Sequence, residues 1–374
     1  MRFLRRNKID KTILVLSDLH LGAGPHVDGK PNVLEDFHYD EELVDFLTYF
    51  SNGEFAQREV ELIINGDLFD LLAVPFVPFF DDEYWSEEAS LHKLKMITSA
   101  HPEVMEALNH FTSVKNKKII YIIGNHDGEC ILDSLRSHIM NFFDEKNKKM
   151  FKIISPEDGE YTPHKGIVIK HGHEYEIANK FKPSESIIED SEGKRYFLPP
   201  WGSYYVVRII NKFKEQRDHI NAVRPIKRFL INGLIYDTLY TLRFLFANSF
   251  YFILVRFVVF LKQGHKLKEV MAHAISELEL FRDYESMTEE YFEENPNTKL
   301  LIMGHTHNPL YKIYAGGETF LNTGTWTDMY YIGFDNKGQG TKLTFAHINT
   351  FKDNFESSLY SWRGKNDRPY ADFF

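Results

Sequence analysis

Five short clusters of acidic, amide and imidazole side chains occur in this 374-residue chain where apolar runs end. They read Ser-Asp-Leu-His at 17–20, Asn-Gly-Asp-Leu-Phe-Asp at 65–70, Gly-Asn-His-Asp at 124–127, His-Gly-His at 171–173 and Gly-His-Thr-His at 304–307. A mixed nitrogen and oxygen set without sulfur suits Mn, Fe or Zn, whereas calcium sites use oxygen ligands. These clusters therefore predict a metal site.

Seven side chains in the clusters are candidate metal ligands. Asp18 and His20 are two residues apart, so they lie on the same side of an extended backbone, as do His305 and His307. Asp67 offers two oxygens that can bridge two cations. The full set is Asp18, His20, Asp67, Asn125, His171, His305 and His307. Two ions roughly 3.5–4 Å apart would hold the attacking and leaving oxygens of an in-line displacement at phosphorus.

Four apolar runs must position these groups. Residues 12–16, 60–64, 118–123 and 166–170 are rich in Ile and Val and lack polar alternation, as expected for strands buried on both faces. In α/β folds, ligands gather outside the carboxyl ends of the strands. We therefore expect four successive strands to deliver their polar clusters to one edge.

The rest of the chain divides into a helical stretch and a return to strands. Long helical patterns follow residue 176, and apolar strands are expected again at 299–303, 318–321, 329–334 and 341–346. The predicted units are a core of 1–175 and 297–347, a helical insertion of 176–296, and a C-terminal tail of 348–374 that no pattern places.

The ordered set D-x-H, G-D-x-x-D, G-N-H-D, H-G-H and G-H-x-H resembles the calcineurin-like metallophosphoesterase superfamily over residues 12–175 and 297–347. One block alone arises readily as turn chemistry, but five blocks in family order, each after an apolar strand, are a specific signal. The resemblance implies an α/β fold, a four-layer α/β/β/α sandwich with a helical insertion, and a dinuclear metal centre at its rim.

The resemblance also implies a role for each matching position. One metal would take Asp18, His20, Asp67 and His307, and the other would take Asp67, Asn125, His171 and His305. The His of G-N-H-D protonates the leaving-group oxygen in relatives, which nominates His126, and the second Asp of G-D-x-x-D orients it, which nominates Asp70. A helix-capping role for Asp70 stays open. Asp127 could support the metal ligands or belong to a turn, and the turn role is favoured. We expect His173 not to be a ligand, because the family uses the first His of H-G-H.

The insertion differs in composition from the rest of the chain. Residues 208–268 contain twelve Lys and Arg against three Asp and Glu, a net charge of +9 in a chain of −10 overall. Ten of the 34 residues at 229–262 are aromatic, and polar breaks predict two or three helices there. A buried helical core or a dimer interface would account for this composition. So would a basic lid that handles a lipid or lies on an anionic membrane surface, which we favour.

We do not expect the insertion to cross a membrane. Its longest uncharged run, 244–255, has twelve residues, fewer than the roughly 18 needed to span a bilayer. His171 and His305 flank the insertion and should bind one metal, so a single crossing would place them on opposite sides. The apolar run at 13–16 is also shorter than the roughly 7–15 residues of a signal peptide. We expect a cytoplasmic protein, peripheral at the inner face of the membrane if the lid binds lipid.

A narrower resemblance concerns the substrate. The insertion between H-G-H and G-H-x-H, with Asp-Leu-His-Leu at 18–21, Gly-Asp-Leu-Phe at 66–69 and Asn-Thr-Gly-Thr-Trp at 322–326, resembles the UDP-2,3-diacylglucosamine diphosphatase branch. Those enzymes cleave a diphosphate in a lipid A precursor whose acyl chains lie under the lid. That branch has Arg where this chain has His126, and H-G-D where this chain has H-G-H.

The sequence therefore predicts an enzyme, a metal-dependent phosphohydrolase with two divalent ions, Mn first and Fe or Zn as alternatives. The predicted reaction is attack by metal-bound hydroxide on a phosphoester or diphosphate of a phosphorylated small molecule or lipid. The alternative is a soluble phosphodiesterase, nuclease or protein phosphatase whose insertion is a protein or homodimer interface. A non-catalytic scaffold is disfavoured because all seven ligands are present. The net charge disfavours a general nucleic-acid binder, and the single cysteine, Cys130, excludes an internal disulfide.

Overall fold

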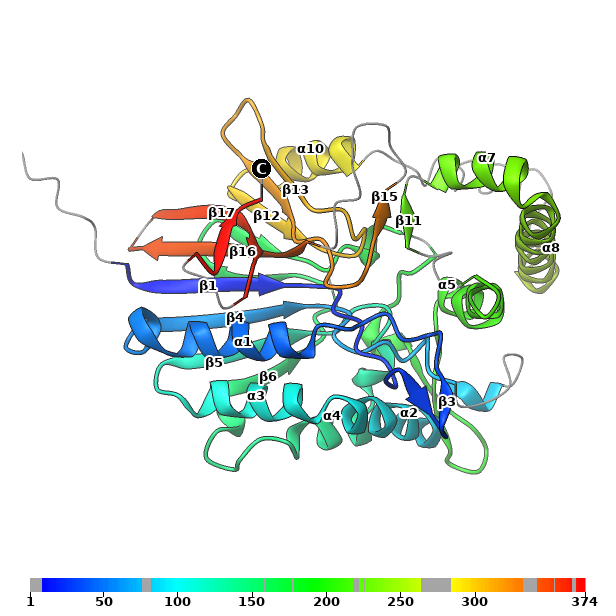
Figure 1. Cartoon of the computed structure of the whole chain (residues 1–374), viewed down its shortest axis with the longest axis horizontal. Coiled ribbons are helices and arrows are strands. Elements are labelled where there is room, and N and C mark those ends of the chain that lie inside the picture. Colours follow the sequence, from blue (N-terminus) through cyan, green and yellow to red (C-terminus); the bar gives the residue numbers. More distant parts are fainter. Residues whose placement is uncertain are drawn as a thin grey trace, which may run out of the picture.

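The computed structural model describes residues 9–75, 82–157, 159–176, 178–217, 222–224, 226–263, 284–331, 342–352, 354–364 and 368–373. Two β-sheets pack face to face and helices cover their outer faces (Figure 1). This arrangement confirms the predicted α/β/β/α sandwich. Residues 264–268 of the basic insertion, and 332–334 and 341 of two predicted strands, lie outside the described residues.

The first sheet has seven strands in the order β18-β17-β16-β1-β4-β5-β6. Its parallel half is β1 (Lys11–Leu16), β4 (Glu59–Asn65), β5 (Lys117–Ile122) and β6 (Phe151–Ile154). Its antiparallel half is β16 (Leu343–Phe351), β17 (Asn354–Trp362) and β18 (Tyr370–Asp372).

The second sheet has five strands in the order β13-β14-β12-β8-β7. Its members are β7 (Tyr161–His164), β8 (Ile167–Ile169), β12 (Leu300–Met303), β13 (Leu310–Ile313) and β14 (Thr319–Asn322). Because β12 runs parallel to both β8 and β14, the loops after β8 and β12 leave the sheet side by side. These two loops carry the last two polar clusters.

The apolar runs are buried on both faces, as their composition predicts. Along β1, Ile13 and Val15 pack against the second sheet, whereas Leu14 and Leu16 pack against the helices. Those helices are α1 (Asp40–Ser51), α2 (Glu87–Ala100), α3 (Pro102–Ser113) and α4 (Asp133–Met140). Successive side chains of a strand point to opposite faces, so one strand supplies both cores.

Helix α10 (Tyr284–Glu294) covers the outer face of the second sheet. Its Tyr291 and Phe292 pack against Val168 and Leu301 of β8 and β12. Sequence patterns had placed this helix in the insertion of 176–296, but its packing makes it the fourth layer of the sandwich.

The segment 348–374, which no sequence pattern places, is built into the first sheet. Nine-residue strands β16 and β17 pair antiparallel, and β16 pairs with β1. Phe345 and Trp362 on these strands contact Phe46 of α1 at ring-centroid distances of 5.0 and 5.3 Å. The described part of this segment is therefore core sheet, and its aromatic residues help to bury α1.

Helices α7 (Ile226–Tyr236) and α8 (Thr238–Gln263) form the basic aromatic region and stand beside the sandwich (Figure 1). Two helices over this region agree with the predicted two or three, and α8 runs unbroken through the polar residues Arg243 and Asn248. Shorter elements precede them: β9 (Ile187–Glu189), β10 (Arg195–Phe197), α5 (Trp201–Tyr205), α6 (Asn211–Lys214) and β11 (Val223–Arg224). The remaining short strands are β2 (His26–Val27), β3 (Lys30–Pro31) and β15 (Tyr330–Tyr331). In the described part of the chain, no helix combines the length and apolarity needed to cross a bilayer.

Candidate metal centre

The polar clusters meet at the carboxyl ends of the strands that precede them. Asp18 and His20 follow β1, Asp67 follows β4, Asn125 follows β5, His171 follows β8, and His305 and His307 follow β12. Five of these seven residues have φ between 52° and 64°: Asp18, His20, Asp67, His305 and His307. Such conformations cost non-glycine residues on the order of 1–3 kcal/mol each and are concentrated at active sites. The surrounding fold therefore holds the ligand-bearing turns in strained conformations.

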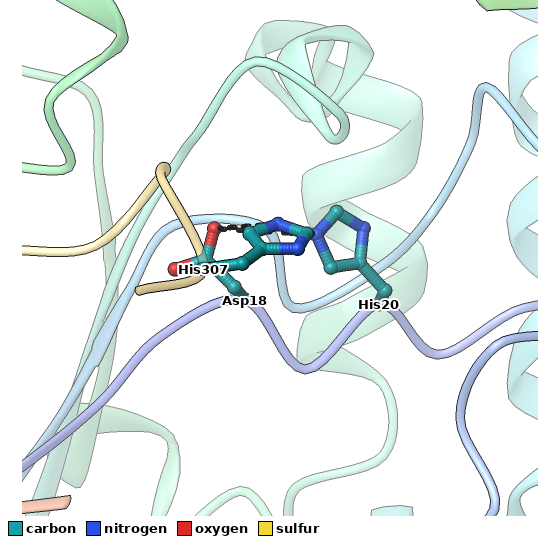
Figure 2. Close-up of side chains that lie close together, drawn as sticks. All are labelled: Asp18, His20 and His307. Carbon is teal, nitrogen blue, oxygen red and sulfur yellow. Dashed lines mark hydrogen bonds and ion pairs between the residues drawn. The ribbon is translucent and has the colours of Figure 1, made fainter. Parts of the chain in front are cut away.

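Asp18, His20 and His307 form the first group of converging donors (Figure 2). His20 Nε2 lies 3.0 Å from His307 Nε2, and His307 Nε2 lies 3.4 Å from Asp18 Oδ1. Asp67 is adjacent, because its Oδ2 lies 3.8 Å from His20 Nε2. The structure thus brings together the four side chains that the family pattern assigns to one metal.

Asp67, His171 and His305 form the second group. His171 Nε2 lies 3.1 Å from Asp67 Oδ2 and 3.2 Å from Asn125 Oδ1. The Asn65 carbonyl oxygen lies 2.7 Å from His171 Nδ1. Because a carbonyl oxygen only accepts hydrogen bonds, Nδ1 carries the proton and Nε2 faces the acidic cluster. The four side chains assigned to the other metal are therefore also adjacent, and Asp67 is common to both groups.

Two buried carboxylates dominate the electrostatics of this site. Among the described residues, only histidines form ion pairs with Asp18 and Asp67. Burial raises the pKa of the Asp67 carboxyl, but His171 and His126 lower it well below its usual range. Burial lowers the pKa of His171, but Asp67 and Asp18 raise it to about 10. Without metal, imidazole protons therefore balance the buried carboxylates.

The donor set fits two divalent ions. Metal ligands must be deprotonated, so bound ions would replace the imidazole protons as the positive charge beside Asp18 and Asp67. The ligand atoms within each group lie no more than 4.8 Å apart, and the mixed nitrogen and oxygen donors suit Mn, Fe or Zn. Which of these side chains bind metal remains a prediction.

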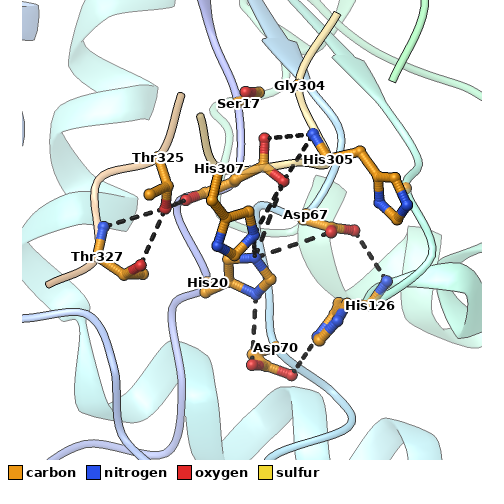
Figure 3. Close-up of polar contacts among 12 residues, drawn as sticks. Ser17, His20, Asp67, Asp70, His126, Gly304, His305, His307, Thr325 and Thr327 are labelled. Carbon is orange, nitrogen blue, oxygen red and sulfur yellow. Dashed lines mark hydrogen bonds and ion pairs between the residues drawn. The ribbon is translucent and has the colours of Figure 1, made fainter. Parts of the chain in front are cut away.

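Asp70 contacts two imidazoles at once (Figure 3). Its Oδ1 lies 2.9 Å from His126 Nδ1, the contact that an orienting role requires, and its Oδ2 lies 3.3 Å from His20 Nδ1. Asp70 Oδ1 also accepts the backbone N–H of Ala73 at 3.1 Å, which closes the turn after β4. The Asp70 carboxylate thus contacts the candidate ligand His20 and the candidate acid His126, and it also stabilises the turn from Asp70 to Ala73.

His126 is placed to hold a proton at the edge of the site. Its backbone N–H donates to Asp67 Oδ1 at 2.8 Å, and its side chain remains 20% exposed. Burial lowers the pKa of His126, but Asp70 and Asp67 raise it to about 9. The ring is therefore protonated at neutral pH in the absence of metal. His20, Asp67 and His126 also converge within 4.8 Å, so a ligand role for His126 is the alternative that metal analysis separates.

Two motif glycines leave room for ligands of other motifs. A Cβ on Gly66 would lie 2.2 Å from Nδ1 of His171, and one on Gly124 would lie 2.2 Å from Oδ1 of Asp67. Contacts this short do not occur, so any larger residue would displace a candidate ligand. Glycine is thus required because each loop packs against a ligand from another strand.

Asp127 connects two of the ligand-bearing loops. Its buried carboxylate accepts the backbone N–H of Gly124 at 2.6 Å and that of Leu68 at 2.8 Å. The loop after β5 is thereby tied to the loop after β4. The contact with Gly124 closes the turn at 124–127, and the contact with Leu68 supports the loop that carries Asp67, so Asp127 fills both roles.

Two polar contacts to the site were missed by sequence reasoning. The hydroxyl of Thr325 donates to the Asp18 carbonyl at 2.6 Å, and its signal was the Asn-Thr-Gly-Thr-Trp motif. Glu176 Oε2 lies 2.9 Å from His305 Nε2, and no pattern in the insertion pointed to it. His173, which was expected not to be a ligand, stacks on Phe181 and belongs to neither group.

A comparison with protein families matches residues 11–309 to the family described as calcineurin-like phosphoesterase. No curated protein sequence matches the chain. Solved structures that match the chain include an archaeal phosphodiesterase, at 11% identity, covering 93% of this chain and 99% of that one, with a TM-score of 0.30. They also include Vps29 from Entamoeba histolytica with bound Zn²⁺, at 13% identity, 96% of each chain and a TM-score of 0.29. A third, the 5'-nucleotidase from Candida albicans, has 12% identity, covers 95% of this chain and 53% of that one, and has a TM-score of 0.31.

Proposed function

The chain belongs to the calcineurin-like phosphoesterase family, and from this premise we propose that it hydrolyses a phosphate ester or diphosphate bond with His126 as the proton donor. It is a metal-dependent phosphohydrolase. The observation that carries the proposal is the sharing of Asp67 by two donor groups, with the protonated His126–Asp70 pair beside them. A phosphoesterase fold that served only as a binding scaffold would not require a proton donor at this position.

Each side chain has a proposed task at the metal centre. Asp18, His20, Asp67 and His307 would hold one ion, and Asp67, Asn125, His171 and His305 would hold the other, with Mn²⁺ the first candidate. Such ions, when bound, supply Lewis-acid stabilisation of a phosphoryl group and lower the pKa of water. The buried Asp67 carboxylate keeps both donor groups in one low-dielectric cluster.

His126 would deliver the proton to the leaving-group oxygen. Its Nδ1 is held by Asp70, so the proton available for transfer is on Nε2. Asp70 and Asp67 raise the pKa of this ring against the effect of burial, so the ring is protonated at neutral pH in the absence of metal. General acid catalysis of this kind contributes about 10²–10⁴-fold to a rate.

The first experiment measures hydrolysis of an aryl phosphate monoester and an aryl diester with Mn²⁺ and with excess chelator. We expect turnover that chelator abolishes. His126→Ala should retain both ions and lose about 10²–10⁴-fold in rate. The surface variant His110→Ala is the control, because His110 is an exposed residue of α3. Chelator-insensitive turnover would refute the metal mechanism, and loss of an ion in His126→Ala would make His126 a ligand instead.

A second proposal concerns the substrate class, which we propose to be lipid-linked. One hairpin, α7 and α8, exposes large apolar side chains: Ile231, Leu234, Ile235, Tyr236, Leu239, Leu242, Phe246 and Phe250. Leu239 and Phe246 are 74% and 72% exposed. Leu239, Leu242, Phe246 and Phe250 recur at three- and four-residue intervals, so they share one face of α8. We call these eight residues the hairpin face.

The insertion is anchored near the metal loops. Lys214 of α6 donates to the Leu34 carbonyl at 3.1 Å and pairs with Asp36 at 2.6 Å, on the segment after β1. Asn211 donates to the Leu72 carbonyl at 2.8 Å, on the loop after β4. The hairpin face therefore extends from elements fixed to the segment between β3 and α1 and to the loop after β4 that carries Asp67.

These features support a lid for an amphiphilic phosphorylated substrate at an anionic membrane surface. The +9 charge of 208–268 would attract anionic headgroups, and the hairpin face would enter the interfacial region. The substrate of the UDP-2,3-diacylglucosamine diphosphatase branch has both features, because it carries an anionic diphosphate and apolar acyl chains. The protein would then work at the inner face of the cytoplasmic membrane.

Vesicle sedimentation tests this proposal. With vesicles containing phosphatidylglycerol we expect co-sedimentation that weakens as salt rises, and with neutral vesicles much less. If the protein sediments with neither vesicle type and is a dimer in solution, the result would instead support the protein-interface alternative.

A further inference from the structure

Two of the candidate metal ligands, His171 and His20, have a hydrogen-bond acceptor beside the ring nitrogen Nδ1, while Nε2 lies among the other candidate ligands. The Asn65 carbonyl faces His171 Nδ1 at 2.7 Å, and the Asp70 carboxylate faces His20 Nδ1 at 3.3 Å. This pattern is the usual support of a metal-ligating histidine, because an acceptor at one nitrogen fixes the tautomer and the ring orientation. It also identifies which nitrogen remains for the metal.

His305 shows the same pattern with a partner from the insertion. Its Nε2 lies 2.9 Å from Oε2 of Glu176, and its side chain is only 8% exposed. A carboxylate only accepts hydrogen bonds when ionised, so Nε2 bears the proton. The atom left to face Asp67 and His171 is therefore Nδ1.

Local structure fixes the Glu176 carboxylate. Glu176 follows the 3-10 turn His173–Tyr175, and the Asn179 side-chain amide donates to its Oε2 at 2.7 Å. Asn179 is in turn confined by Gly202 at the start of α5, where a Cβ would lie 2.4 Å from Asn179 Oδ1. The Gly202 N–H donates to the Ala178 carbonyl at 2.8 Å. The orientation of Glu176 thus depends on how the insertion packs.

We propose that Glu176 is a positioning residue of the metal centre, which accepts the Nε2–H of His305 and so presents Nδ1 of His305 to the second metal. The insertion thereby contributes a residue to the metal centre. This inference rests on the proposed metal-binding function. It makes the occupancy of the second site depend on a residue outside the sandwich.

The expected effect follows from the chemistry of the pair. A carboxylate at the far nitrogen raises the basicity of the imidazole and restricts its rotation. Removing such a partner typically weakens metal binding by about 10–100-fold. Glu176→Ala removes the acceptor, whereas Glu176→Gln keeps a neutral oxygen acceptor in a chain of the same length. We therefore expect a graded loss, larger for Ala than for Gln.

The test is titration of the full-length, metal-free protein with Mn²⁺ in competition with a fluorescent chelator. The wild type should bind two ions. Glu176→Ala should weaken one of them by about 10–100-fold and leave the other near its wild-type affinity, with Glu176→Gln between. Glu185→Ala is the matched control, because Glu185 lies in the same insertion, is 69% exposed and forms an ion pair with Lys182 rather than with a candidate ligand.

The outcomes are distinguishable from those that test the enzyme itself. If Glu176→Ala binds two Mn²⁺ ions with the same affinities as the wild type, the inference is overturned and the proposed function stands. Absence of Mn²⁺ binding in the wild type would overturn both. If Glu176→Ala melts below the wild type without metal, Asn179→Ala decides: selective weakening of one site supports the inference, and unchanged binding overturns it.

Discussion

One carboxylate, that of Asp70, joins the candidate ligand His20 to the candidate acid His126, with Oδ2 3.3 Å from His20 Nδ1 and Oδ1 2.9 Å from His126 Nδ1. Its pKa lies far below the usual range: burial would raise it, but His126 and His20 lower it more strongly. Asp70 is therefore a permanent anion that both rings share. We therefore expect metal binding by His20 and proton donation by His126 to be coupled through Asp70.

Asp70→Asn should lower both metal affinity and turnover. An asparagine amide has one accepting oxygen and one donating nitrogen, so it cannot accept from both rings. The pKa of His126 should also fall, because Asp70 is the largest of the effects that raise it. Since the acid must be protonated, the decline of the rate at high pH should begin at a lower pH in the variant.

Profiles of kcat and kcat/KM against pH, with metal content measured on the same samples, check this prediction. Asp133→Asn serves as the control, because Asp133 is a carboxylate of α4 that is 82% exposed. An unchanged high-pH limb in Asp70→Asn would show that Asp70 does not set the protonation of His126.

Gly66→Ala should abolish binding of the second metal. The added methyl would lie 2.2 Å from His171 Nδ1 and displace that ring, and Gly66 also has a φ of 83°. Gly53→Ala separates the two causes, because Gly53 has a φ of 52° and no atom within 4 Å of its added Cβ. The control should cost only about 1–2 kcal/mol of unfolding free energy, the strain of left-handed backbone, and keep its metals.

Metal stoichiometry and thermal melting of the two glycine variants give the comparison. If Gly66→Ala binds two ions as tightly as Gly53→Ala does, the close packing of the loops after β4 and β8 does not govern the site.

His101, which is not a candidate metal ligand, should make stability depend on pH. Its Nδ1 lies 2.6 Å from Asp40 Oδ1 and its Nε2 lies 3.2 Å from the Gly22 carbonyl, so both nitrogens face acceptors. Burial lowers the pKa of His101, but Asp40 and Glu35 raise it above its usual value. A raised native pKa stabilises the fold fully below about pH 6.5, the unfolded value, and this contribution is lost as the pH rises through the native pKa.

Urea unfolding from pH 5 to 9 measures this contribution. His101→Asn should cost about 1–3 kcal/mol at pH 6, and the cost should shrink as the pH increases. The exposed His110→Asn should show no such trend. A cost for His101→Asn that grows with pH would contradict the sign of the shift.

Polar substitution of the hairpin face should affect lipid-linked substrates selectively. Leu239→Ser with Phe246→Ser removes two largely exposed apolar side chains, so vesicle binding and hydrolysis of a lipid diphosphate should fall at least tenfold, as each buried methylene contributes about 0.8 kcal/mol. Turnover of a soluble aryl phosphate should stay unchanged. Ile313→Ser in β13, where Ile313 is 63% exposed, controls for loss of surface apolarity elsewhere. Equal losses on both substrates would place the effect in the active site rather than at a membrane.

The sequence determined the chemistry of the site because its signals are local. Each ligand follows an apolar strand within a few residues, as Asp67 follows β4 and His171 follows β8. Strands of that composition are buried on both faces, and parallel strands bring their carboxyl ends to one edge. The type of fold and the partners of Asp67 were therefore predictable without coordinates.

Only the tertiary structure decided the contacts made across long sequence separations. The strands β16 to β18 extend the first sheet through pairing between β16 and β1, over 300 residues apart, and α10 packs on the second sheet although residues 284–294 fall within the predicted insertion. Likewise the contact of Glu176 with His305 depends on how the insertion packs at Gly202. Periodicity reports which residues form a strand or helix, but which elements pair is decided by burial and hydrogen bonding in the folded chain.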